Sequence, residues 1–333
     1  MSVGRATCWV VAVASLIVGS SSSSNLSSST STHGASSVGS EKVVINTPWW
    51  PAGTERSAEA IGILSHGEIF MTGMMEYNKT IALQVVQEMD DVSDIAKGGK
   101  TDLNHITSCL IHTKQPGTSS SVRELFKHAL APYGGAALTV QEMPGEYSVA
   151  TTSITCHAIS STDTKTLVNG TGANDVAVAS SNLIHVSVEG ATVASAVTAA
   201  SELLDKTAVA AIVGTTEKAT VKAESKNADP PALVDCVVVL RKISDAPDVR
   251  SAFSSSKNPP ALTIVQGGMT TGANVALHCT AVPHESDITA THTVPNKDNS
   301  TSLPPAYAVT AGNFVYASGI GAQMINATDG LVR

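Results

Sequence analysis

The chain has 333 residues, of which 42% are hydrophobic and 4% aromatic, and its formal net charge is −8. That length allows about two domains of ~100–200 residues each, and the hydrophobic fraction is ample for their cores. The acidic balance and the lack of a Lys/Arg cluster argue against a nucleic-acid-binding surface, which needs a basic face.

The N-terminus has the pattern of a secretory signal peptide. Arg5 precedes an apolar stretch from Ala6 to Val18, and the small residues Gly19 to Ser21 follow it. This stretch is shorter than the ~20 apolar residues of a spanning helix, so we predict a signal peptide over residues 1–21 and no membrane association after cleavage. We therefore expect a protein of the secretory pathway or the extracellular space, with an organelle as the alternative.

Residues 22–42 are rich in Ser and Thr. Such a segment buries too little apolar surface to offset its ordering entropy, so we predict a disordered linker. Sequons of the form Asn-x-Ser/Thr support export only weakly in a chain so rich in these residues. They begin at Asn25, Asn78, Asn169, Asn299 and Asn326.

The following segment alternates strands and helices. Residues 68–73 read as a strand that ends at a glycine, and residues 80–97 as an amphipathic helix with Val85, Met89 and Val92 on one face. Gly98 and Gly99 end that helix. Beyond it we predict a strand over 105–113, a helix over 121–130, and strands over 136–141 and 153–159.

The same order returns in the second half of the chain. We predict strands over 182–188, 234–240, 261–266 and 274–281, and helices over 192–213 and 247–253. Residues 122–126 (VRELF) return as 249–253 (VRSAF), and residues 137–141 (ALTVQ) return at 261–266 (ALTIVQ), about 125 residues later. Such a period is longer than that of solenoid repeats, so each copy is expected to be a domain of its own.

This layout predicts an α+β fold with two tandem domains, residues 43–160 and 170–283, each a mixed sheet with helices on one face. Residues 284–302 are expected to be a linker, and residues 303–333 the N-terminal part of a third repeat. Because helices cover one face only, the other face of each sheet must be buried by association between copies.

Four cysteines fall at matching places in the two copies, Cys109 with Cys236 and Cys156 with Cys279. Their spacing is not that of a zinc site. We interpret them as buried strand cysteines that act as small hydrophobes, with disulfides as the alternative.

Residues 312–319 (GNFVYASG) resemble the signature of the RidA family, also known as the YjgF or L-PSP endoribonuclease type, in which a short apolar strand ends in Ser-Gly. Residues 66–73 (HGEIFMTG) are similar, with Thr72 in place of the serine, and residues 182–188 keep Ser187 but have Val188 in place of the glycine. The resemblance implies a chorismate-mutase-like fold that trimerises, with small-molecule clefts between neighbouring subunits. It also implies hydrolysis of reactive enamines and imines to ketones, with release of ammonia.

Members of the family hold the substrate with an arginine in a Pro-Ala-Arg-Ser/Thr string, because a guanidinium binds a carboxylate bidentately. Residues 260–263 (PALT) place Leu262 where the arginine belongs, and residues 132–138 contain no arginine and end at Leu138. We therefore expect the clefts to present aliphatic surface, with no lysine as a substitute. His157 and His278 recur near the last strand of each copy, where a histidine can act as a base, although a strand histidine is more often structural.

No residue is predicted to be catalytic, and neither a cofactor nor a metal is expected. The candidate cleft residues are Thr72, Gly73, Leu138, His157, Ser187, Leu262, His278, Ser318 and Gly319.

The missing arginines predict a RidA-like protein that has lost the family chemistry. It would bind a small carbonyl or imine metabolite, or a partner, at clefts between domains, and its domains would associate in a trimer-like manner. An active enamine/imine deaminase is the alternative. An endoribonuclease is the weaker alternative, because an acidic chain without a basic groove is poorly suited to RNA.

Overall fold

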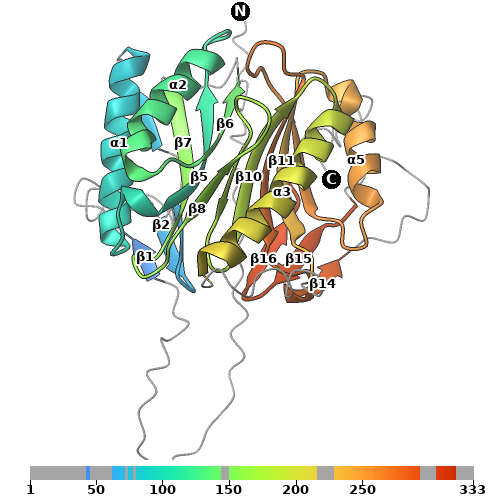
Figure 1. Ribbon diagram of the computed structural model, residues 1–333. Helices are drawn as coiled ribbons and strands as arrows, with labels where there is room; N and C mark the ends of the chain where they lie inside the picture. Colours follow the sequence, from blue (N-terminus) through green and yellow to red (C-terminus); the bar gives the residue numbers. More distant parts are fainter. Residues whose placement is uncertain are drawn as a thin grey trace, which may run out of the picture.

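The computed structural model describes residues 43–45, 62–71, 74–77, 80–143, 150–215, 229–292 and 305–319. These residues form a mixed α+β structure of three β-sheets with four α-helices. Figure 1 shows the blue and green helices over one large sheet, the yellow and orange helices over the other, and a small red sheet beside the second. The predicted signal peptide and Ser-rich linker lie outside the described residues.

The first sheet has seven strands and is covered by the helices α1 (Ile81–Gly98) and α2 (Ser119–Leu130). Its strands are β1 (Val43–Ile45), β2 (Gly62–Ser65), β3 (Glu68–Met71), β4 (Met74–Tyr77), β5 (Ile106–Thr113), β6 (Ala137–Glu142) and β7 (Ala150–Ile159). They are ordered β1-β2-β3-β7-β5-β6, and β4 also pairs with β7. β5 and β6 run parallel and are connected through α2, whereas the other pairs are antiparallel.

The second sheet has six strands and is covered by α3 (Val193–Thr215) and α5 (Ala246–Ser254). Its strands are β8 (Thr166–Asn169), β9 (Val176–Ala179), β10 (Ile184–Gly190), β11 (Ala232–Leu240), β12 (Ala261–Gln266) and β13 (Val275–Val282). They are ordered β12-β11-β13-β10-β9-β8. The parallel pair β11 and β12 is connected through α5.

The two large sheets have the same internal order. β2-β3-β7-β5-β6 in the first corresponds to β9-β10-β13-β11-β12 in the second. The pairing register shifts in corresponding places, between Ile106 and Ser108 in β5 and between Leu233 and Asp235 in β11. A bulge at the same point of the corresponding strand pair is a specific similarity between the two sheets, because a bulge changes the direction in which nearby side chains point.

The third sheet consists of β14 (Ile288–His292), β15 (Ala308–Ala311) and β16 (Phe314–Ala317), paired antiparallel in that order. β16 lies within residues 312–319, where the short apolar strand of the signature was expected, and β15 precedes it in a hairpin. β14 lies within residues 284–302, where a linker was expected, so part of that linker is ordered as a strand.

The predicted helices are confirmed with small differences at their ends. α1 buries Val85, Met89 and Val92, the residues that defined its apolar face. α2 begins at Ser119, two residues earlier than expected, because the Glu142 carboxylate at the end of β6 accepts the Ser119 N–H at 3.0 Å. An acceptor from a distant strand replaces the local cap that a sequence motif would supply. No helix in the described residues combines the length and apolar character needed to cross a bilayer.

Each large sheet buries one face under its helices and the other against the remaining sheets. The helix-side cores contain Phe126 of α2 over the first sheet and Leu203 of α3 over the second, and both side chains are buried. A further apolar cluster joins Leu183 and Val234 of the second sheet to Phe314 and Tyr316 of the third, with Phe70 of the first packed against it. The three sheets therefore meet along their helix-free faces, which we call the inner core.

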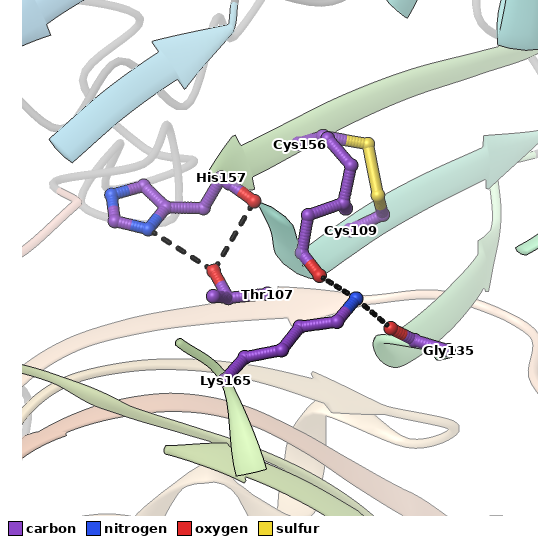
Figure 2. The surroundings of a disulfide bond; sticks show 7 residues. Thr107, Cys109, Gly135, Cys156, His157 and Lys165 are labelled. Atoms are coloured by element: carbon purple, nitrogen blue, oxygen red, sulfur yellow. Dashed lines mark hydrogen bonds between the residues drawn. A yellow bond between two sulfur atoms is a disulfide. The ribbon is translucent and has the colours of Figure 1, made fainter. Parts of the chain in front are cut away.

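Disulfides connect the cysteines that were interpreted as free thiols. Cys109 in β5 is bonded to Cys156 in β7, and Cys236 in β11 to Cys279 in β13. In both cases the two residues stand directly opposite each other in an antiparallel pair. Figure 2 shows the first bond with His157 and Thr107 beside it. The interpretation as unbonded hydrophobes is wrong, and the alternative of disulfides holds.

Candidate functional site

The two leucines at the family's arginine position point away from the spaces between sheets. Leu138 of β6 is 6% exposed and Leu262 of β12 is 2% exposed, and both belong to the helix-side cores. Leu138 is paired with Cys109 and Leu262 with Cys236, so pleating places each leucine on the same face as its disulfide. The expectation that these side chains form an aliphatic cleft surface is therefore wrong.

The space between β6 and β10, which we call the first crevice, contains a chain of buried polar groups. The Ser187 hydroxyl donates to the Leu138 carbonyl at 2.7 Å, and Thr139 Oγ1 lies 2.8 Å from Ser187 Oγ. Because Ser187 uses its only proton on Leu138, Thr139 must donate to Ser187. His278 Nδ1, at 3.1 Å from Thr139 Oγ1, then donates to Thr139.

This assignment fixes the state of His278. Its Nδ1 carries the proton, and its Nε2 has the free lone pair. Burial lowers the pKa of His278 to about 4, so the ring is neutral near pH 7. In this state Nε2 is the acceptor nitrogen of a neutral ring.

The first crevice also holds a guanidinium that the sequence did not predict. Arg123 of α2 donates to the Leu138 carbonyl and to the Glu189 carboxylate of β10, and the Arg123 and Glu189 side chains are only 4% and 7% exposed. Glu189 also accepts the Thr270 hydroxyl at 2.8 Å and the Asn174 amide at 2.8 Å. We call Arg123 and Glu189 the crevice ion pair.

A lysine lies just before the start of β6. Lys165 Nζ donates to the carbonyls of Ile106 at 2.8 Å and Gly135 at 2.6 Å, and Figure 2 shows it reaching Gly135. Burial lowers the pKa of Lys165 to about 8, and Asp102 opposes that shift. The expectation of no cation near this crevice is therefore wrong, although both cations donate to groups of the protein itself.

The second crevice, between β12 and β16, also brings a serine to the backbone of a leucine, through a different backbone group. Ser318 Oγ accepts the Leu262 N–H at 2.7 Å and donates to the Ala306 carbonyl. Gly319 N–H donates to Thr263 Oγ1 at 2.8 Å. A Cβ at position 319 would lie 2.6 Å from Thr263 Cγ2, so only glycine permits this approach. The predicted residues Leu138 and Ser187, and Leu262, Ser318 and Gly319, are thus brought together in two matching places.

The inner core contains buried titratable groups from all three sheets. His157 Nδ1 lies 3.6 Å from Glu68 Oε2, and its ring centroid is 4.5 Å from that of His185. Burial raises the pKa of Glu68 to about 8, with Asp163 adding to the rise. Burial lowers the pKa of His157 to about 3, and it also holds the pKa of His185 well below its ordinary value. Carboxyl and rings are therefore uncharged near pH 7, as a low-dielectric site favours.

His157 and His278 do not occupy corresponding positions. His157 stands opposite Phe70, and Thr280 stands opposite His185, the residue that matches Phe70. His278 lies two residues earlier on β13, opposite Ser187. Both rings are on the helix-free face, since both are one residue from a disulfide cysteine, but only His278 reaches a crevice.

Two of the predicted cleft residues cannot be placed in the structure. Thr72 and Gly73 lie outside the described residues. Within the described residues, no group of three or more His, Cys, Asp and Glu side chains is arranged to hold a metal ion.

One signal for the crevice ion pair was present in the sequence, because the repeated Val-Arg-x-x-Phe string puts a cation beside two core residues.

Comparisons with known proteins place the chain near solved structures only. No family model and no curated protein match it. A member of the YjgF family from Neisseria meningitidis is 16% identical, covers 36% of this chain and 96% of its own, and has a TM-score of 0.31.

A Rid family protein of unknown function from Yersinia pestis is 19% identical, covers 36% of this chain and 99% of its own, and has a TM-score of 0.31. A member of the YjgF/YER057c/UK114 family from Mycobacterium tuberculosis is 11% identical, covers 36% and 99%, and has a TM-score of 0.32. Likenesses of this size carry no argument about activity.

Proposed function

We propose that the chain is a tandem RidA-like protein, with two copies over residues 43–160 and 170–283 and the start of a third over 303–333. The matching strand orders of the two large sheets and the matching bulges support this division. The packing of three sheets along their helix-free faces reproduces, within one polypeptide, the association that the resemblance implies for separate subunits.

We propose further that the protein lacks the deaminase chemistry. The observation that carries this proposal is the crevice ion pair. The Arg123 guanidinium already donates one bond to the Glu189 carboxylate and one to the Leu138 carbonyl, so neither of these N–H groups is available to hold a carboxylate substrate. Displacing Glu189 would leave a buried charge without its partner, at a cost of several kcal/mol.

The remaining function is binding. The relay from His278 through Thr139 to Ser187 leaves the imidazole Nε2 as an acceptor, which suits the N–H of a small neutral imine better than an anion. Partner binding at the crevices is the second form of this proposal. An active deaminase is the alternative, and the presence of Arg123 in the first crevice is the observation that favours it.

Ammonia release from enamines that are generated from serine or threonine separates these two functions. We expect no acceleration by the purified wild-type chain over buffer. Acceleration that is abolished in Arg123→Met would overturn the proposal and assign the guanidinium to the reaction. Cooperative unfolding of each sample shows that an inactive protein is folded.

Rescue by an added anion tests directly whether the Glu189 carboxylate occupies a carboxylate-binding site at Arg123. Glu189→Ala removes the carboxylate and leaves Arg123, Thr270 and Asn174 as donors around the vacated space. Acetate should raise the melting temperature of Glu189→Ala but neither that of the wild type nor that of Arg123→Met/Glu189→Ala. Equal effects of acetate on all three proteins would contradict a carboxylate-sized site at Arg123. Glu189→Gln, which keeps the shape, serves if the alanine variant does not fold.

We also propose export through the secretory pathway. The two disulfides support it, because such bonds persist in oxidising compartments and are rare in the cytosol. The N-terminal pattern, in which Arg5 precedes an apolar stretch, also indicates export. Removal of the N-terminal segment during translation in the presence of microsomes would test it.

A further inference from the structure

Asn169 is the last residue of β8 and begins an exposed turn. Residues 169–171 (NGT) form a sequon, and the side chains of Asn169 and Thr171 are both exposed. The backbone of Asn169 pairs with Val176 of β9, so the strand fixes the residue while leaving its amide in solvent.

The turn is held from within by Asp175. Gly170 N–H donates to the Asp175 carbonyl at 2.7 Å, and Gly172 N–H donates to Asp175 Oδ2 at 2.8 Å. A Cβ at position 170 would lie 2.5 Å from Asp175 Cβ, so the turn needs a glycine there. The buried side of the turn is thus occupied by Asp175, and Asn169 is left with no packing role to disturb.

We propose that Asn169 is an N-glycosylation site, an inference that rests on the proposed export. The co-reactant is an oligosaccharide linked to a lipid pyrophosphate. The amide nitrogen of Asn169 forms a bond to the anomeric carbon, whose bond to the pyrophosphate oxygen breaks. The bonding electron pair leaves with the lipid pyrophosphate, and the amide proton passes to a base of the transferase. The Thr171 hydroxyl supplies the third position of the sequon.

Two observations independent of the sequon support this site. The disulfides Cys109–Cys156 and Cys236–Cys279 favour folding in an oxidising compartment, which is where this transfer takes place. A glycan at Asn169 would also extend from the exposed end of an edge strand, where bulk protects unpaired backbone groups from association with other chains.

The turn also connects the site to the first crevice. Asn174, in the same turn, donates to Glu189 of the crevice ion pair at 2.8 Å. Asn174 is not in a sequon and its amide is engaged, whereas Asn169 has the sequon and the exposed amide. The structure therefore distinguishes two asparagines five positions apart by their surroundings as well as by their motif.

The test uses the full chain translated with microsomes in two forms, with its own N-terminus and with an added cleavable signal. The tryptic peptide from Thr166 to Lys206 contains one sequon, at Asn169. In the form with the added signal we expect this peptide to carry a glycan that peptide N-glycosidase removes. Thr171→Ser should keep the glycan, and both Thr171→Ala and Asn169→Gln should lose it.

The two forms separate a failure of the site from a failure of export. An unmodified peptide in protein whose added signal has been cleaved would overturn the site while leaving export untouched. A glycan with the added signal, but none with the native N-terminus, would show that the native chain is not exported, and the proposal would fail for that reason. A glycan in both forms supports it.

Discussion

Both crevices bring a serine to the backbone of a leucine, but the bonded backbone group and the charge differ between them. Ser187, in the middle of β10, donates to the Leu138 carbonyl, whereas Ser318, just after β16, accepts the Leu262 N–H. The first crevice adds a buried ion pair, whereas the second adds a close approach of Gly319 to Thr263. The sheet geometry thus fixes where the serine lies, and the side chains around it decide the chemistry.

The largest effect should come from the ion pair. Arg123→Met leaves Glu189 buried with one fewer donor, which should cost about 3–5 kcal/mol of unfolding free energy. Arg250 occupies the matching place on α5 but is only half-buried, so Arg250→Met should cost clearly less. Urea denaturation at neutral pH measures both. Equal losses would mean that the two crevices are energetically alike.

The disulfides should give large and matched effects. Their sequence separations are 47 residues for Cys109–Cys156 and 43 for Cys236–Cys279, so the entropy they remove from the unfolded chain is nearly the same. Replacing either pair by alanine should cost about 2–5 kcal/mol, with little difference between the pairs. Denaturation of the two double variants without reductant checks this. A loss confined to one pair would contradict the equivalence of the two large sheets.

The pH dependence should report on the inner core. The folded pKa values of His157, about 3, and His278, about 4, are depressed below the ordinary 6.5, so their contribution is lost as pH falls below about 6.5. The folded pKa of Glu68, about 8, is raised above its ordinary 4.5, so its contribution is lost as pH rises from about 4.5 to 8. Stability should therefore fall on both sides of a maximum near pH 6.5.

A single substitution tests the origin of the fall in stability above neutral pH. Between pH 7 and 8 Glu68 should account for the decline, because burial raises the pKa of Asp235 only to about 7. Glu68→Gln should therefore remove the decline over that interval, where Lys165, whose pKa burial lowers to about 8, contributes a slope of opposite sign. Glu124→Gln, at an exposed position on α2, should leave the decline in place. One proton contributes at most about 1.4 kcal/mol per pH unit, so a steeper slope would show that other groups titrate there.

The sequence predicted what depends on local patterns. The helix ending at Gly98 and the strand 261–266 follow from apolar periodicity, which a single segment contains. The role of Arg123 could not be predicted, because Glu189 lies 66 residues away and reaches it only after two sheets have packed. The expected correspondence of His157 with His278 was wrong for a related reason. His278 lies two residues away from the position that matches His157, and such a displacement along a strand keeps a side chain on the same face but gives it different neighbours.

The smallest effects should come from the serines, and they should be unequal. In Ser187→Ala the Leu138 carbonyl keeps its bond from Arg123. The Thr139 hydroxyl loses Ser187 as its acceptor but can donate to His278 Nδ1 once the ring proton moves to Nε2, so we expect a loss of about 1 kcal/mol. Ser318→Ala leaves the buried Leu262 N–H without its acceptor, and an unsatisfied buried donor costs about 1–3 kcal/mol. The second crevice should thus depend more on its serine than the first. Equal losses would mean that water replaces the hydroxyl at Leu262, because a solvated N–H carries no such penalty.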